Sequence, residues 1–458
     1  MRPIFAGAAI VALSSVLAGP IEAQGNPSQF GCQGLETDRD LPSIEGKDGV
    51  FFRINADLRM NHPFSDNVVA QMAEFANALA EQGTTLIYVP IPTKSVTMPE
   101  HLPENAWLYG FDLDVATWVH VDILNRLNAA GVVTVDVREA MQQTPDGTLP
   151  FFKADFHWTA HGAAEAAKAI AEVFRALPGY AELDKTEHAT VETGVETAFS
   201  GMRRILQKHC LETLPEAKTM TFDTQLASVT DIFGTADDAS DDAGEDQGGG
   251  LDIFGADTAA IPVALIGTSF SDSPINNFPG FIAQYSELEV INYAITGGNQ
   301  FGAMTSYLTS SEFQENRPRF IIWENPIYNN LAQYGDQPFG ELIAAARKDC
   351  PITLATALSE DGRTLRAELS GDTPSGALFV DSDGSVGLEA RFRFASAEGY
   401  TRTKTILRGE RLRRTGRFYM PLSGLWPDGA RAVEVELSQA FGPNPTLQLC
   451  DPQSEDKS

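Results

Sequence analysis

The sequence is poor in cysteine, in basic residues and in long apolar stretches. Four cysteines in 458 residues exclude a disulfide-dense scaffold, although they suffice for two bridges in an oxidising compartment. With 33 Lys and Arg against 62 Asp and Glu, the net charge is -29, so the chain is expected to repel nucleic acid. After the first residues no run of 18 apolar residues occurs, and no further membrane span is expected.

What remains is ordinary globular composition, with 43% hydrophobic and 21% charged residues. At roughly one domain per 100 to 200 residues, the length indicates two or three domains. Residues 1–23 have the layout of a secretory signal peptide: Arg2 precedes an apolar stretch, Pro20 interrupts it, and Ala23 is a small residue before the expected cleavage site. A membrane anchor is the alternative, but the stretch is short for one. We expect a mature protein exported to the periplasm.

Residues 24–345 alternate between helical and extended patterns. Apolar runs expected to form strands lie at 85–91, 132–137, 261–266, 288–292 and 320–323, and helical patterns lie at 68–79, 113–129 and after residue 158. Such strands between helices are typical of a parallel sheet covered on both faces, so we predict a doubly wound α/β domain. Residues 231–257 hold nine acidic and no basic residues. We interpret them as a solvated insertion, with a calcium site as the alternative.

Residues 346–458 follow a period of two, which predicts a small antiparallel β-sandwich. Between residues 391 and 431 lie ten basic and three acidic side chains, a net of +7 on a very acidic chain. This stripe is either a solvated strand face or a surface that binds an anion. Export would also oxidise the cysteines. Of the three possible pairings, the simplest joins Cys32 to Cys210 and Cys350 to Cys450, with one bridge in each domain.

The candidate nucleophile is Ser269. An apolar strand runs into Gly267, so the hydroxyl of Ser269 follows the carboxyl end of a strand, where doubly wound sheets bind ligands. A base that removes its proton would make it a nucleophile, and backbone N–H groups of the turn can face a developing oxyanion. Gly-Thr-Ser alone is a weak motif.

The candidate base is His157 in the segment Lys-Ala-Asp-Phe-His-Trp-Thr, residues 153–159. Asp155 and His157 lie on the same side of an extended backbone, so the carboxylate can accept from Nδ1 and leave Nε2 free. A histidine that caps the next helix is one alternative. A metal pair with His161 is another, but no third ligand segment is evident, and no cofactor or metal is expected.

Together these motifs resemble the AlgX/AlgJ family of SGNH-hydrolase-like O-acetyltransferases of bacterial exopolysaccharides, chiefly alginate. The resemblance also covers Ile44-Glu-Gly-Lys-Asp-Gly49, Val89-Pro-Ile-Pro-Thr-Lys94 and Trp323-Glu-Asn-Pro326. The Asp-His pair precedes the serine, a permutation of the ordinary SGNH order. A C-terminal carbohydrate-binding sandwich is similar to AlgX and is absent from AlgJ.

The resemblance implies that Ser269 carries an acetyl group, that His157 is the base and that Asp155 orients it. It also implies an active-site role for Tyr328, and an oxyanion donor at Asn292, Gly298 or Asn299. Trp158 either stacks on a sugar or packs the loop. Independently of the resemblance, guanidinium groups bind uronate carboxylates in bidentate fashion, which makes candidates for substrate contacts of Arg391, Arg393, Arg402 and Arg408.

The predicted function is therefore periplasmic O-acetylation of an anionic exopolysaccharide through an acetyl-serine intermediate. An acetyl donor or acetyl-carrier protein of a membrane acetylation system would be a partner, as would proteins of an export complex. Two alternatives stay open: an acetylesterase of the same fold, which differs only in admitting water, and a polysaccharide-binding export component without activity.

Overall fold

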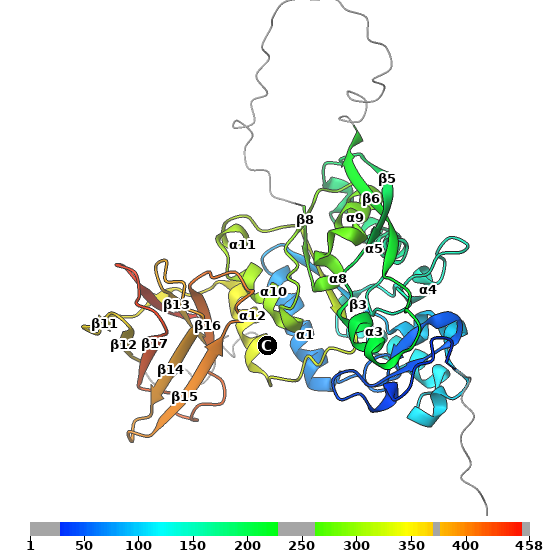
Figure 1. The fold of residues 1–458 in the computed structure, drawn as a ribbon. Helices are drawn as coiled ribbons and strands as arrows, with labels where there is room; N and C mark the ends of the chain where they lie inside the picture. Colours follow the sequence, from blue (N-terminus) through cyan, green and yellow to red (C-terminus); the bar gives the residue numbers. More distant parts are fainter. Residues whose placement is uncertain (1–27, 228–261, 370–375, 451–458) are drawn as a thin grey trace, which may run out of the picture.

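The computed structural model describes residues 28–227, 262–369 and 376–450. The predicted signal peptide and the acidic insertion at 231–257 lie outside these residues. The chain forms an α/β lobe and an all-β lobe, with α10 and α12 between them (Figure 1). None of the helices in the described ranges combines the length and apolarity needed to cross a membrane.

A parallel five-stranded sheet forms the centre of the α/β lobe, in the order β4-β3-β9-β7-β8. Its strands are β3 (Thr85–Ile91), β4 (Val133–Thr134), β7 (Val263–Ile266), β8 (Val290–Asn292) and β9 (Phe320–Pro326). The predicted α/β class and all five strand positions are confirmed, although β4 is shorter than the expected 132–137. Because the strands are parallel, β3, β7, β8 and β9 end at the same edge of the sheet.

Alternate side chains of the strands enter two separate hydrophobic cores. In β7, Ala264 and Ile266 join one core, whereas Val263 and Leu265 join the other. The first core contains α1 (Asp66–Ala80), α10 (Asn299–Leu308) and α12 (Gln337–Arg347); the second contains α5 (Ala160–Ala176) and α9 (Phe278–Ser286); α3 (Leu113–Ala129) contributes to both. Burial on both faces explains why these strands read as continuous apolar runs.

Further strands and short helices lie outside the central sheet. A long antiparallel pair of strands, β5 (His188–Thr197) and β6 (Lys218–Leu226), packs beside α5 and α9. The sequence did not predict it, because β5 is largely exposed and lacks an apolar period. The remaining short elements are β1 (Ser43–Glu45), β2 (Phe51–Arg53), α2 (Lys94–Thr97), α4 (Arg138–Met141), α6 (Gly201–Leu206), α8 (Ser269–Asp272) and α11 (Ser311–Glu315).

The all-β lobe is a sandwich of two antiparallel sheets, as predicted. One sheet has the order β10-β18-β13-β16 and the other β11-β12-β17-β14-β15. Their strands are β10 (Ile352–Thr353), β11 (Thr356–Leu358), β12 (Thr364–Glu368), β13 (Ala377–Asp381), β14 (Glu389–Ala395), β15 (Thr401–Leu407), β16 (Arg417–Pro421), β17 (Ala432–Leu437) and β18 (Thr446–Cys450). The alternate residues Ala390, Phe392 and Phe394 of β14 enter the core between the sheets.

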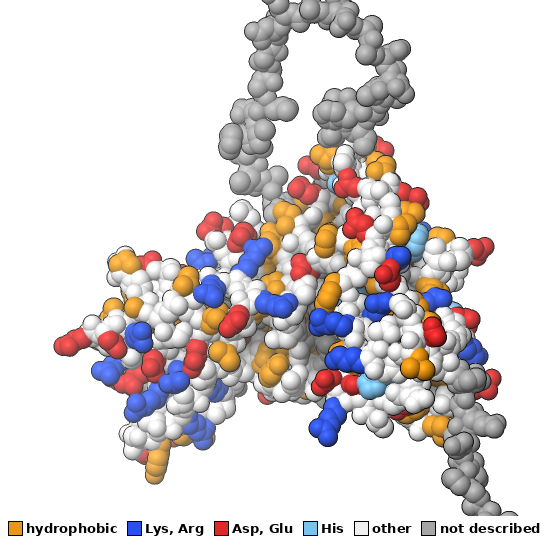
Figure 2. All heavy atoms as spheres, in the orientation of Figure 1, with side chains coloured by type: hydrophobic (Ala, Val, Ile, Leu, Met, Phe, Trp, Pro, Cys, Tyr) orange, Lys and Arg blue, Asp and Glu red, His pale blue; other side chains and the backbone are white. Residues whose placement is uncertain are grey.

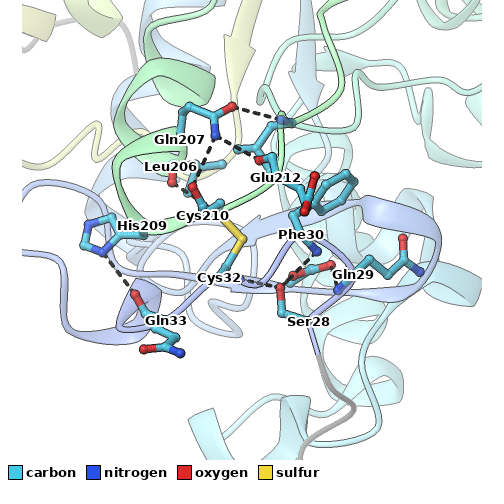
Figure 3. Close-up of a disulfide and its surroundings, with 12 residues drawn as sticks. Ser28, Gln29, Phe30, Cys32, Gln33, Leu206, Gln207, His209, Cys210 and Glu212 are labelled. Atoms are coloured by element: carbon cyan, nitrogen blue, oxygen red, sulfur yellow. Dashed lines mark hydrogen bonds between the residues drawn. A yellow bond between two sulfur atoms is a disulfide. The ribbon is translucent and has the colours of Figure 1, made fainter.

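Two disulfides join Cys32 to Cys210 and Cys350 to Cys450, which confirms the expected pairing. The first ties the N-terminal segment to the chain just after α6 (Figure 3). Its partners are 178 residues apart, so it removes much of the freedom of the unfolded chain. The second joins the start of the sandwich to its last strand.

The two lobes meet at a buried ion pair. Arg408, which follows β15, donates to both carboxylate oxygens of Glu341 on α12, one of them at 2.8 Å. Both side chains are almost fully withdrawn from solvent. The sequence prediction that Arg408 contacts carbohydrate is therefore wrong: its guanidinium binds the neighbouring lobe.

Replacing Arg408 with Met would leave the Glu341 carboxylate buried without its cation. We expect the free energy of unfolding to fall by about 3–5 kcal/mol, measured by urea denaturation. Arg366→Met is the matched control, because Arg366 pairs with Glu434 on an exposed sheet face; its loss should cost less than about 1 kcal/mol. Equal small effects in the two variants would contradict the role of the buried pair.

Candidate active site

The strand–turn–helix around Ser269 exposes one hydroxyl at the carboxyl edge of the sheet. β7 ends at Ile266, and Ser269 is the first residue of α8, with the Thr268 side chain capping that helix. The side chain of Ser269 is partly exposed. A Cβ on Gly267 would lie 2.4 Å from Glu324 Oε2, so glycine is required for this close approach.

Three side chains from two distant segments form a chain of hydrogen bonds. Ser269 Oγ lies 2.7 Å from His157 Nε2, and His157 Nδ1 lies 2.7 Å from Asp155 Oδ1. His157 keeps 23% of its side chain exposed, whereas Asp155 is buried. The structure thus brings together the three residues that the sequence singled out, in the order that makes a serine nucleophilic.

The carboxylate of Asp155 is held by more than the imidazole. Oδ1 also accepts from the backbone N–H of His157 at 2.8 Å, and Oδ2 accepts from Ser200 Oγ at 2.5 Å. Burial by itself would raise the pKa of Asp155, but these hydrogen bonds outweigh it and lower the pKa below its ordinary value. Asp155 therefore stays ionised, which favours a positive charge on His157 during a reaction.

A buried lysine fixes the backbone that carries Asp155. Lys94 Nζ donates to the carbonyls of Phe51, Lys153 and Asp155 at 3.0, 2.8 and 2.9 Å. Its side chain is 1% exposed, and burial lowers the pKa of Lys94 to about 7. Three carbonyls replace the water that the ammonium loses, so β2 and the Asp155 loop are joined at one point.

Behind the nucleophile lies a second buried carboxylate, Glu324 of β9. It accepts from Thr268 N at 2.7 Å and from Ser271 Oγ at 2.9 Å, and the Thr268 hydroxyl contacts both its oxygens. Burial raises the pKa of Glu324 to about 7. These bonds join the central strand to both sides of Ser269.

Tyr328 lies just beyond β9 and contacts the triad through intermediates. The guanidinium of Arg53 is sandwiched between the rings of Phe156 and Tyr328, at 4.5 and 4.6 Å, and pairs with Asp57 through two hydrogen bonds. The Phe156 ring in turn packs on that of His157, with centroids 4.1 Å apart. Burial raises the pKa of Tyr328, while the charge of Arg53 opposes the shift.

Trp158 is fully buried, so the prediction that it contacts a sugar is wrong. Its indole packs against Phe270 and Phe278, and Nε1 donates to the Phe270 carbonyl at 2.8 Å. It therefore holds α8 next to the nucleophile. His161, considered as a metal ligand, lies on α5 with its ring edge-on to Phe222.

The three oxyanion candidates differ in what their donors already bind. Gly298 was predicted as a candidate oxyanion donor, but its N–H already donates to the Ile295 carbonyl at 3.0 Å. Asn292 Nδ2 donates to Ser271 O at 2.8 Å. Asn299 is exposed and accepts two backbone N–H groups through Oδ1, while its amide nitrogen has no partner among the described residues. In the same ranges the Ser269 N–H also makes no hydrogen bond.

The other three arginines that were predicted to bind the polymer already have partners within the sandwich. On the outer face of the second sheet Arg391 contacts Glu389 and Glu436, and Arg393 contacts Glu434. Figure 2 shows blue and red side chains interspersed over this lobe. Arg402 donates to two carbonyls of its own lobe, including Gly424 O at 2.9 Å, and lies over Trp426. Glutamates thus neutralise Arg391 and Arg393 within the expected electropositive face, whereas Arg402 binds carbonyl groups.

Four supporting residues of the site were not predicted from sequence: Ser200, Arg53, Asp57 and Phe156. Ser200 is separated from Asp155 by 45 residues and looks like an ordinary helix cap, which it also is. Lys94 and Glu324 were included in segments with a family resemblance, but without a role. In the sequence, the only indication of such a role was a single charged residue next to an apolar or Pro-rich strand end: Lys94 after residues 89–93, and Glu324 after residues 320–323.

Comparison with known proteins agrees with this geometry. A family model described as an SGNH hydrolase-like domain, acetyltransferase AlgX, matches residues 44–327. The alginate biosynthesis protein AlgX of Pseudomonas aeruginosa is 29% identical over 290 residues, which are 63% of this chain and 56% of that protein. The probable alginate O-acetylase AlgJ of the same organism is 27% identical over 278 residues, covering 59% of this chain and 67% of AlgJ.

The fold is also similar to a solved structure. The structure of Pseudomonas aeruginosa AlgX superimposes with a TM-score of 0.72 at 23% identity, and the match covers 89% of this chain and 93% of that one. This likeness includes both lobes and concerns the fold. The curated AlgX sequence, in contrast, is matched over little more than half its length.

Ser200→Ala would remove one donor from the buried Asp155 carboxylate. A hydrogen bond to a charged group contributes about 1.5–3 kcal/mol, so acylation of Ser269 by an activated aryl acetate should slow roughly 10- to 100-fold. Ser65→Ala is the matched control, because Ser65 caps α1 and has no contact with the site. Unchanged acylation in Ser200→Ala would show that Asp155 does not need this donor.

Glu324→Gln should flatten the dependence of stability on pH. Since the folded pKa of Glu324 is about 7 against an ordinary 4.5, the native state holds a proton that the unfolded chain releases. Stability is therefore lost as pH rises from about 5 through about 7, by up to about 3 kcal/mol. This loss is measured as the difference between the free energies of unfolding at the two ends of this pH window, with Glu104→Gln, at an exposed position, as the control. If the free energy of unfolding changed with pH equally in wild type and Glu324→Gln, the role of Glu324 would be refuted.

Proposed function

This chain belongs to the AlgX family of SGNH hydrolase-like acetyltransferases, and we propose that it transfers acetyl groups to hydroxyls of an anionic exopolysaccharide. The observation that carries the proposal is the hydrogen-bonded chain from Ser269 through His157 to Asp155. A partly exposed serine whose hydroxyl is hydrogen-bonded to a histidine base is suited to accept an acyl group. The names of the relatives support an alginate-like polyuronate as the acceptor.

In the first half-reaction His157 Nε2 takes the proton of Ser269 as Oγ attacks the carbonyl carbon of an acetyl donor. The new C–O bond gives a tetrahedral oxyanion, for which the Ser269 N–H and the Asn299 amide are the proposed donors. When the bond to the leaving group breaks, His157 returns its proton to that group. Ser269 is then an acetyl ester, and Asp155 has stabilised the transient imidazolium.

In the second half-reaction a sugar hydroxyl replaces the leaving group. His157 removes the proton of that hydroxyl, its oxygen attacks the acetyl carbon, and the bond to Ser269 Oγ breaks. The proton passes to Ser269, so the enzyme is regenerated and the polymer gains one acetyl group. An acetylesterase would use water in this step, and the competition between the two acceptors decides which activity dominates.

The setting of the reaction is proposed from the same features. Two disulfides suit an oxidising compartment such as the periplasm, where a signal peptide at residues 1–23 would direct the chain. An acetyl donor or carrier protein delivers the group, and export proteins hold the polymer nearby. We propose that the polymer contacts Arg391, Arg393 and Arg402. Its carboxylates would have to displace the glutamates that now pair with Arg391 and Arg393.

Ser269→Ala should abolish acetylation of mannuronate oligomers by an activated acetyl ester, since both half-reactions use that hydroxyl. Mass spectrometry of the oligomers measures the added acetyl groups. Ser65→Ala is the matched control, because the Ser65 hydroxyl caps α1 and has no contact with the site, so this variant should retain transfer. Transfer by Ser269→Ala would disprove the proposal, and release of acetate without oligomer acetylation by the wild type would favour the esterase.

A further inference from the structure

The segment between β15 and β16, residues 408–416, extends from the sandwich onto the α/β lobe, and we name it the arm. Leu412 at its centre is 7% exposed and fills the space beside Gly302 of α10. A Cβ on Gly302 would lie 2.6 Å from Leu412 Cδ2, so the two elements are in close contact. Thr415 Oγ1 adds a hydrogen bond to Thr309 Oγ1 at 3.0 Å.

Two arginines of the arm contact the loop that follows β8. Arg411 Nη1 donates to the Thr296 carbonyl at 3.2 Å. The guanidinium of Arg413 lies 5.0 Å from the ring centre of Tyr293 and forms an ion pair with Glu312. The arm therefore contacts the loop at Tyr293 and Thr296, and contacts the helix α10 that follows the loop at Gly302.

The other side of this loop is bonded to the segment that carries the nucleophile. Before Ser269, Tyr293 N donates to Leu265 O at 2.8 Å and Ile295 N donates to Gly267 O at 3.1 Å. After Ser269, Thr296 N donates to Asp272 Oδ2, and Nδ2 of Asn292, the last residue of β8, donates to Ser271 O, both at 2.8 Å. The four bonds bracket the nucleophile, and Thr296 is shared with the arm.

We infer that Arg411 and Leu412 of the sandwich are positioning residues for the reaction at Ser269. Arg411 holds the loop after β8, and Leu412 holds the first turn of α10 to which that loop leads, so that the sandwich forms part of the structural support of the active site in addition to any contact with polymer. The inference rests on the proposed role of Ser269 as nucleophile. A positioning role and a polymer-binding role make different predictions. If the arm positions the nucleophile, changing it should slow the reaction even of a substrate that is too small to reach the sandwich.

Leu412→Ala and Arg411→Met in the full chain test this with an activated aryl acetate as substrate. A displacement of about 1 Å can cost up to 10²-fold in rate, so we expect kcat to fall about tenfold or more while KM stays unchanged. Leu412→Met, which keeps the volume, should restore kcat. Circular dichroism establishes that each variant is folded, and Arg411→Met decides the matter if Leu412→Ala does not fold.

The matched controls lie on the arm and at the end of the strand that precedes it. Arg414 is exposed on the arm and makes no hydrogen bond or ion pair within the described residues, and Leu407 at the end of β15 is 73% exposed. Arg414→Met and Leu407→Ala should keep the wild-type kcat. Wild-type kcat in Arg411→Met and folded Leu412→Ala, or equal losses in the controls, would overturn the inference. Hydrolysis by Ser269→Ala at the wild-type rate would instead refute the proposed function, whatever the arm variants do.

Discussion

The buried carboxylate of Asp155 is the charge on which the site depends. An isolated carboxylate in a protein interior would be neutralised by protonation, but here three hydrogen bonds stabilise the ionised form. Ser200 and the backbone of His157 fix its two oxygens, and Lys94 fixes its own carbonyl. The imidazole is held in one orientation by Asp155, and only then does Nε2 point at Ser269. Ser200 and Lys94 thus position Asp155, Asp155 positions His157, and His157 contacts Ser269.

The nucleophile is positioned in the same way from the opposite side. Glu324 on the central strand bonds the turn before and after Ser269, and Gly267 permits that approach. The end of β8 and the loop after it add four hydrogen bonds, and the arm of the sandwich contacts the outer side of that loop. A reactive serine at a sheet edge thus receives support from strands, from a neighbouring loop and from a second lobe.

Patterns that repeat along the chain could be predicted, and contacts between distant segments could not. Continuous apolar strands such as 85–91 predicted the covered parallel sheet, and the alternation around Phe392 predicted the sandwich, because burial imposes these periods. The spacing of Asp155 and His157 predicted their pairing, since it is a local geometric property. Ser200, Lys94 and Glu324 act through tertiary contacts with no local signature. For the same reason composition predicted a basic face near Arg391, while strand register places Glu436 beside it.

The most direct test of the account is to trap the acylated enzyme. The mature protein, mixed with an activated acetyl ester without acceptor and quenched in acid, should carry one acetyl group, located on Ser269 by peptide mass spectrometry. Addition of polyuronate before quenching should remove that group and place it on the polymer. An acetyl group at any other residue, or polymer acetylation with no acetyl-Ser269 at any time, would contradict the account.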